Sequence, residues 1–227
     1  MGLKNVRHLD STETGGSSYI LHVGHAAQAI AEGKCSVALI TLAGRPRQAR
    51  GGGGRGGGFG EPAPEAGFEN IYGGSTHNTY GMCAMRHMYE YGTTSEQLAW
   101  IKVAASHHAQ WNERAFLKDV VTVEQVVNSR MIADPLHLLD CCVVTDGGGA
   151  LLVVSPEVAR SLNRPKVKIM GAGEAPKGPS GGLDLDLTHS GAVWSGPRAF
   201  EEAGVKPADI KYASIYDSFT ITVLMQL

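Results

Sequence analysis

The sequence has little net charge, few cysteines and no long apolar run, and each shortage excludes a class of protein. The formal net charge of the 227 residues is −2, so neither nucleic acid nor an anionic membrane surface would attract the chain over a distance. The four cysteines show no CxxC spacing, and the adjacent Cys141 and Cys142 are poor disulfide partners. No stretch approaches the roughly 18 consecutive apolar residues of a membrane span, and the N-terminus lacks the apolar run of a signal peptide. We therefore expect a cytoplasmic protein with reduced cysteines, and a small molecule or another protein as its partner.

Apolar residues are present in sufficient number to bury a core. They make up 43% of the sequence, against 19% charged residues, which is unlike a disordered chain. Ile20, Val23, Ala27 and Ile30 recur at helical spacing after a glycine elbow. A continuous apolar run over residues 37–43 follows and is typical of a buried strand. A helix followed by a buried strand indicates an α/β protein.

Residues 45–66 interrupt this pattern with glycine, arginine and proline. They offer no periodic apolar face, so the composition predicts a flexible surface segment. A nucleic-acid-binding tail is the alternative interpretation. We expect no nucleic-acid binding, because the few arginines offer few of the phosphate contacts that such a tail needs.

The rest of the chain predicts alternating helices and strands. Met82, Met85, Met88 and Tyr89 are spaced for one helical face, and Thr93 or Thr94 is placed to cap the next helix. The expected helices are 80–91, 95–105, 123–129, 156–163 and 197–203, and the expected strands are 151–155, 166–170 and 212–216. The order of these elements along the chain predicts βα units, then a helical insertion, then further βα units.

Five stretches, in this order, resemble the thiolase superfamily, and most closely its lipid-transfer or sterol-carrier-type branch. Each is weak alone, but together they span nearly the whole chain. They are Thr12-Glu-Thr-Gly-Gly-Ser-Ser and the residues 26–44, 85–105, 129–155 and 196–220.

The resemblance implies a five-layer α-β-α-β-α fold built from two similar halves, with a helical loop domain inserted into the first. On this basis residues 1–44 belong to the N-terminal half, 45–145 form the inserted loop domain, 146–163 hold the last strand of that half, and 164–227 begin the C-terminal half. We expect the chain to be an internal fragment of such a domain pair, truncated at both ends. Family motifs with glycine-histidine-proline and cysteine-glycine would lie beyond its C-terminus.

The nucleophile position of the family holds Thr12. In the family a cysteine stands three residues before the glycine of the elbow, where the helix dipole lowers a thiol pKa. Counting back from Gly15 leads to Thr12, an alcohol with no evident base, which disfavours ordinary thiolysis. Glu13 can act as a base or simply as a first-turn acid, and the Gly15 and Gly16 amides can cradle a thioester oxygen or form only a tight turn.

Tyr216 is the strongest catalytic candidate. Tyr216-Asp-Ser-Phe stands where the family has Asn-Glu-Ala-Phe or His-Asp-Cys-Phe, whose first residue positions a water or proton donor. A tyrosine exchanges protons with a hydroxyl or an enolate, which suits retro-aldol cleavage without a cysteine. The alternative is a strand-end tyrosine with its hydroxyl in water. Asp217 and Ser218 are candidate substrate-binding residues, although Asp217 can also be structural.

Further site residues and partners follow from the resemblance. His87 and Met88 fall where the family lines its acyl pocket, with plain helix packing as the alternative. The family implies a coenzyme A thioester as substrate and no covalently bound cofactor, a homodimer and, for members without the cysteine, an OB-fold accessory protein. The histidines show no metal-ligand spacing. We thus expect an acyl-CoA enzyme that makes or breaks a C–C bond beside the thioester, or a non-catalytic acyl-CoA or lipid-binding subunit.

Overall fold

The computed structural model describes residues 4–12, 14–47, 75–175, 177 and 186–227. Glu13 and most of the predicted flexible segment at 45–66 lie outside these residues. The chain divides into two compact units, each described by itself. The first contains residues 1–45, 146–176 and 191–214, and the second contains residues 46–145, 177–190 and 215–227. The domain boundaries expected from the sequence stay predictions.

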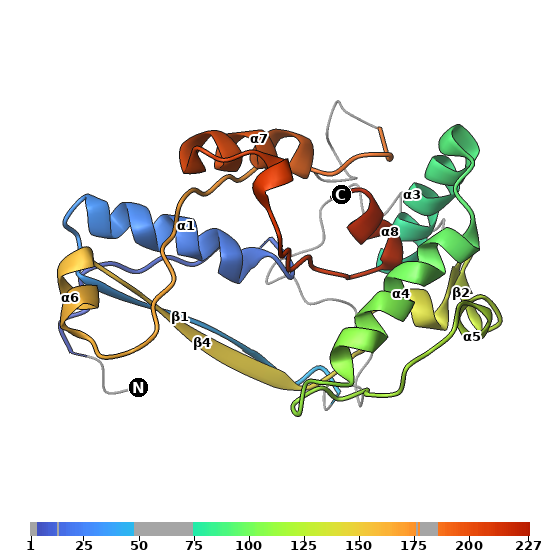
Figure 1. The fold of residues 1–227 in the computed structure, drawn as a ribbon, viewed down its shortest axis with the longest axis horizontal. Helices are drawn as coiled ribbons and strands as arrows, with labels where there is room; N and C mark the ends of the chain where they lie inside the picture. The colour runs from blue at the N-terminus through green and yellow to red at the C-terminus, as the bar shows by residue number, and fades with distance from the viewer. Residues whose placement is uncertain (1–3, 13, 48–74, 176, 178–185) are drawn as a thin grey trace, which may run out of the picture. The chain divides into compact units, whose positions relative to one another are not determined.

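The first unit packs a helix on a two-stranded sheet (Figure 1). Helix α1 (Ser18–Ala31) covers one face of strands β1 (Val37–Gly44) and β4 (Gly147–Val154), which pair antiparallel. Ala26, Ile40 and Val153 form the buried cluster between them. The other face carries Leu39 and Leu152, which are 47% and 61% exposed. The expectation of a fully buried strand at 37–43 is therefore wrong, because only one face of this sheet is covered by a helix among the described residues.

A glycine-rich segment at 171–175 contacts two helices of the same unit. A Cβ atom on Gly24 of α1 would lie 3.0 Å from the Ala172 side chain. One on Gly173 would lie only 2.1 Å from the carbonyl oxygen of Ser195 in α7 (Ala192–Ala203). Side chains at these glycines would separate the backbones. The close approach of the segment at 171–175 to the two helices therefore depends on glycine at positions 24 and 173.

Two expected strands do not form, one in the first unit and one that runs from the first unit into the second. Residues 166–170 and 212–216 form no strand, although their alternation or composition suits one. Val167 is 97% exposed and Tyr212 is 84% exposed. A strand is stabilised by a hydrogen-bonded neighbour, and no strand that the structure describes pairs with either segment. In the first unit the short helix α6 (Pro156–Ser161) matches the helix expected at 156–163, and the short helix η4 (Pro207–Asp209) follows α7.

The second unit is mainly helical. Its elements are α3 (Thr76–Tyr91), α4 (Ser95–Ala109), α5 (Val123–Val127), β2 (Met131–Ala133), β3 (Leu136–His137), η3 (Leu138–Asp140) and α8 (Thr220–Leu224). Thr94 and Gln97 form a reciprocal capping box at α4, which confirms the predicted start of that helix. The core is built from Ala84, Leu98, Leu136, Phe219 and Ile221. In the described part of the chain no helix is long and apolar enough to cross a bilayer.

Candidate functional site

The elbow before α1 is closed by its own hydrogen bonds. Gly15 has a φ of +69°, a conformation that favours glycine. Its carbonyl oxygen accepts from the backbone N–H of Ser18 at 3.2 Å and from the Ser18 hydroxyl at 2.7 Å. The Thr14 N–H donates to the same hydroxyl at 2.8 Å. Ser18 therefore holds the turn that positions Thr12, Gly15 and Gly16 at the start of the helix.

Thr12 has a neighbouring carboxylate that the sequence did not reveal. Its backbone N–H donates to Nε2 of His22 at 3.1 Å, and its hydroxyl donates to Oδ1 of Asp10 at 3.3 Å. His25 binds the other Asp10 oxygen and holds the pKa of Asp10 below its ordinary value of 3.8. A carboxylate with a lowered pKa is a poor proton acceptor. Asp10 therefore does little to activate Thr12, and the hydroxyl stays an unactivated alcohol.

His25 bridges two carboxylates within the first unit. Nδ1 lies 2.5 Å from Oδ2 of Asp10, and Nε2 lies 3.0 Å from Oε2 of Glu174. Both ring nitrogens can donate only when the imidazole is protonated. The Asp10 hydrogen bond, assisted by Glu174, raises the pKa of His25 above its ordinary value of 6.5. The imidazolium joins the segment before the elbow to the segment at 171–175.

This bridge predicts a pH-dependent contribution to stability. Because the pKa of His25 is raised on folding, the contribution is complete below the unfolded-state pKa of about 6.5. It is lost as the pH rises through the higher folded-state value. His25→Gln should therefore flatten the fall in the free energy of unfolding as the pH rises above about 6.5, measured by urea titration. The exposed His108→Gln is the control, and an equal flattening there would contradict the assignment.

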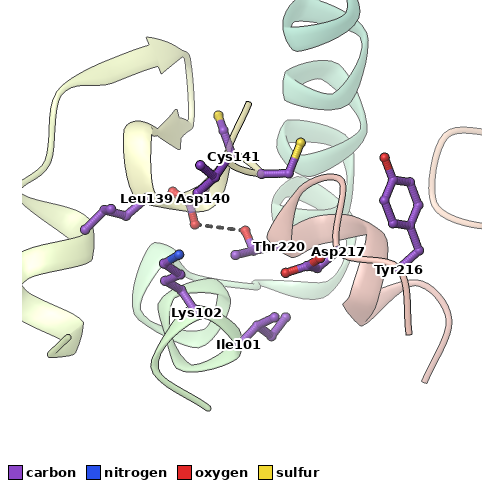
Figure 2. Close-up of a pocket in the computed structure, with 10 residues that line it drawn as sticks. Ile101, Lys102, Leu139, Asp140, Cys141, Tyr216, Asp217 and Thr220 are labelled. Atoms are coloured by element: carbon purple, nitrogen blue, oxygen red, sulfur yellow. Dashed lines mark hydrogen bonds between the residues drawn. The ribbon is translucent and has the colours of Figure 1, made fainter. Parts of the chain in front are cut away.

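A cavity of about 360 Å³ in the second unit brings Tyr216 and Asp217 together with residues that sequence reasoning missed (Figure 2). The lining comes from α4, η3 and the residues after it, and the loop that leads into α8. It consists of Ile101, Lys102, Leu139, Asp140, Cys141, Cys142, Val143, Tyr216, Asp217 and Thr220. Tyr216 lies in a loop rather than at the end of a strand, and its side chain is 45% exposed. Its phenol is thus accessible to a molecule from solution.

The two thiols of this cavity are held in the protonated form. Burial, with the nearby Asp140 carboxylate, raises the pKa of Cys141 to about 11. Cys142 is exposed at the surface, but partial removal of its thiol from water raises its pKa as well, and Asp217 adds to the effect. Only a thiolate is an effective nucleophile. The cavity therefore supplies no activated sulfur, and the phenol of Tyr216, the amine of Lys102 and the carboxylate of Asp217 remain as its groups for proton transfer.

Hydrogen bonds dock the loop that carries Tyr216. The Ser218 carbonyl oxygen accepts from the Cys142 N–H at 3.0 Å, and Cys141 and Phe219 form an antiparallel bridge. The Ser218 side chain is buried and hydrogen-bonded to Thr222 at 2.9 Å. Ser218 is absent from the cavity lining, so its observed contacts hold the loop in place.

His87 and Met88 also lie outside this lining. Nδ1 of His87 is 2.8 Å from the Thr93 hydroxyl, and its ring centroid is 4.6 Å from that of Tyr91. Met88 packs against the core of the second unit. The observed contacts of both side chains are packing contacts. Their role in an acyl pocket stays a prediction. The elbow belongs to the first unit and the Tyr216 cavity to the second.

Comparisons with known proteins agree with this combination of fold and sequence motifs. The family model "Thiolase C-terminal domain-like" matches residues 173–227. An acetyl-CoA acetyltransferase of Methanothermobacter thermautotrophicus is 40% identical over 151 residues, which cover 64% of this chain and 38% of that protein. A 17-hydroxy-3-oxo-4-pregnene-20-carboxyl-CoA lyase of Mycobacterium tuberculosis is 33% identical over 239 aligned positions, covering 100% of this chain and 61% of that protein.

A solved structure extends the likeness to three dimensions. The structure titled "Ltp2-ChsH2(DUF35) aldolase" matches with a TM-score of 0.83 and 33% identity, covering 93% of this chain and 56% of that chain. The chain belongs to the thiolase superfamily. It is similar to the members related to sterol-carrier-protein-2 thiolase, and the predicted thiolase-like α/β fold is confirmed. It spans between 38% and 61% of the length of the two curated relatives described above.

Proposed function

We propose that this protein cleaves the C–C bond beside a coenzyme A thioester by retro-aldol chemistry, with Tyr216 as the proton-transferring residue. The observation that carries the proposal is the placement of Tyr216 at a cavity whose two thiols are protonated. The elbow adds support, because Thr12 occupies the nucleophile position and its neighbour Asp10 is a weak base.

The proposed reaction balances without an added nucleophile. Tyr216 acts in its phenolate form: it takes the proton of the 3-hydroxyl group and becomes a phenol, and the C2–C3 bond breaks as the C3–O bond becomes a carbonyl. The electron pair passes to C2, where the thioester stabilises it as an enolate. Return of the proton to C2 gives a shortened acyl-CoA and an aldehyde or ketone. No acyl group is transferred to the protein.

The relatives support the class of substrate and of reaction. One is named a CoA lyase and one solved neighbour an aldolase, and both extend over most of this chain. We infer a coenzyme A thioester as the substrate, with Asp217 as a substrate contact at the cavity of the second unit. Gly15 and Gly16 of the first unit are, as a separate proposal, amide donors to a thioester oxygen. Glu13 remains a proposed base. The chemistry needs no covalently bound cofactor.

We also infer that the protein works in a complex. The solved aldolase carries a second component in its title, ChsH2(DUF35), which supports the expected accessory protein. A homodimer and a cytoplasmic location are part of the same proposal. Size measurement of the purified protein, alone and with an accessory protein, tests the assembly.

Product analysis tests the reaction. Incubation with a 3-hydroxyacyl-CoA in the absence of free coenzyme A should yield a shortened acyl-CoA and a carbonyl product in equal amounts, measured by mass spectrometry. Cleavage that starts only after free coenzyme A is added would contradict the retro-aldol step. The accessory component is supplied in a parallel reaction.

Thr12 is expected to be dispensable for bond cleavage. Thr12→Ala removes the hydroxyl that donates to Asp10 but no group that the proposed step uses. We expect kcat to stay within about threefold of the wild-type value, well short of the effect of a catalytic acid or base, because the proposed step uses no atom of Thr12. Steady-state kinetics measure it, with Thr12→Ser as the matched control. A loss above about a hundredfold, the scale of a missing catalytic group, would identify Thr12 as one.

A non-catalytic acyl-CoA-binding subunit is the second candidate. It is favoured by the absence of an activated nucleophile at both Thr12 and the cavity cysteines. Binding of an acyl-CoA measured by calorimetry, with no turnover of hydroxy or keto substrates in the presence of the accessory component, would support it over the enzyme.

A further inference from the structure

Asp140 is a buried carboxylate that the proposed chemistry does not use. It is 4% exposed and ends η3. Oδ1 accepts from the hydroxyl of Thr220 at 2.8 Å, and Oδ2 accepts from the backbone N–H of His137 at 2.9 Å. Removing a carboxylate from water is unfavourable unless hydrogen bonds compensate. Both oxygens are therefore committed to protein donors, although the residue borders the cavity.

The contact with Thr220 joins segments eighty residues apart in the sequence. Thr220 is 4% exposed and is the first residue of α8. Tyr216 and Asp217 lie in the loop directly before this helix, and Figure 2 shows the bond between Asp140 and Thr220 beside that loop. A hydrogen bond to an ionised group is stronger than a neutral one. It is well placed to fix the first turn of α8.

The alternative partner of Asp140 is the His137 side chain. Nδ1 of His137 lies 3.6 Å from Oδ2, which is too long for a hydrogen bond. That nitrogen is buried and has no hydrogen-bond partner among the described residues. The carboxylate is thus oriented towards Thr220 rather than towards the imidazole.

We propose that Asp140 is a positioning residue that acts through Thr220 to hold Tyr216 and Asp217 at the cavity. This inference rests on the proposed function of Tyr216. Loss of the Thr220 hydroxyl leaves the carboxylate short of a donor and frees the first turn of α8 to move. The loop then keeps the Cys142–Ser218 backbone hydrogen bond, the bridge between Cys141 and Phe219, and the burial of Phe219 in the core.

Thr220→Val and Thr220→Ser form the matched pair that tests the proposal. Valine keeps the shape of threonine without its hydroxyl, whereas serine keeps the hydroxyl. We expect Thr220→Val to lower kcat at least tenfold with KM within twofold of the wild-type value, and Thr220→Ser to restore kcat to within threefold. Asp140→Asn keeps an acceptor oxygen for Thr220 but loses the charge, so its kcat should lie between those of the two Thr220 variants. It replaces Thr220→Val in the test if the valine variant does not fold. Equal losses in the valine and serine variants, or full kcat in a folded valine variant, would overturn the proposal.

Hydrogen–deuterium exchange separates this inference from the proposed function. Exchange of the amides at 215–220 should be faster in Thr220→Val than in Thr220→Ser, with the rest of the second unit unchanged. If exchange differs in this way but the wild-type protein cleaves no 3-hydroxyacyl-CoA, the proposed function is wrong, whereas the role of Asp140 and Thr220 in holding the loop is supported. If exchange at 215–220 is the same in both variants, the proposed role of Asp140 and Thr220 is wrong, whatever the activity of the protein.

Discussion

Tyr216→Phe is expected to lower kcat for cleavage of a 3-hydroxyacyl-CoA by roughly 10²–10⁴-fold, the range for loss of a positioned proton-transfer group. Phenylalanine retains the ring and removes only the hydroxyl. The side chain is 45% exposed at the cavity, so its loss should leave the packing of the second unit intact. KM should change little, because the lost interaction acts on the transition state. Steady-state kinetics with product detection measure both constants.

Tyr212→Phe is the matched control for Tyr216→Phe. Tyr212 is 84% exposed and is absent from the cavity lining. The same change there should leave kcat unaltered. A Tyr216→Phe variant whose kcat stays within about threefold of the wild-type value, well short of the effect of a catalytic acid or base, would contradict the assigned role.

Gly173→Ala is expected to produce the largest loss of stability among single-methyl additions. The new Cβ would meet the Ser195 carbonyl oxygen of α7 at 2.1 Å, and neither backbone can move without disturbing the packing of the helix. Forcing extra atoms into a packed site typically costs about 1–3 kcal/mol. The free energy of unfolding, measured by urea denaturation, should fall by about this amount.

Gly196→Ala is the control for that substitution. Gly196 lies within α7, and apart from its chain neighbours a methyl group added there would meet nothing within 4 Å. Alanine favours a helix over glycine by about 1 kcal/mol, which offsets the restriction that the following Pro197 places on a residue with a Cβ. The stability of this variant should therefore be unchanged or higher. A destabilisation equal to that of Gly173→Ala would show that the close contact with α7 is not the cause.

Local signals predicted the elements that carry them. The apolar spacing of 20–30 and the run at 37–43 correspond to α1 and β1. The cap expected at Thr93 or Thr94 is Thr94, directly before α4. Helix spacing and capping depend on residues three or four apart. They are therefore readable in one sequence.

Pairing between segments that are distant in the sequence could not be predicted from such local patterns. The alternation at 166–170 gives a strand-like composition, but a strand also needs a neighbour, which the pattern does not specify. The same holds for 212–216. The fully buried strand predicted at 37–43 failed for a related reason, since burial depends on how many faces are covered.

The candidate site was predicted only in part for this reason. Tyr216 and Asp217 came from a motif, and both border the cavity. The Asp140–Thr220 and His25–Glu174 contacts join residues 80 and 149 positions apart, and no local pattern links them. Asp140, Cys141 and Cys142 lie within one of the stretches that resemble the family. That resemblance was the one sequence feature that could have marked them as site residues.

The central claim concerns the reaction rather than the family, and a comparison of two substrates tests it most directly. The wild-type protein, with its accessory component, is given a 3-hydroxyacyl-CoA alone or the matching 3-ketoacyl-CoA with free coenzyme A, and the shortened acyl-CoA is measured in each case. The account predicts cleavage of the hydroxy substrate and none of the keto substrate. Thiolysis of the keto substrate would contradict it.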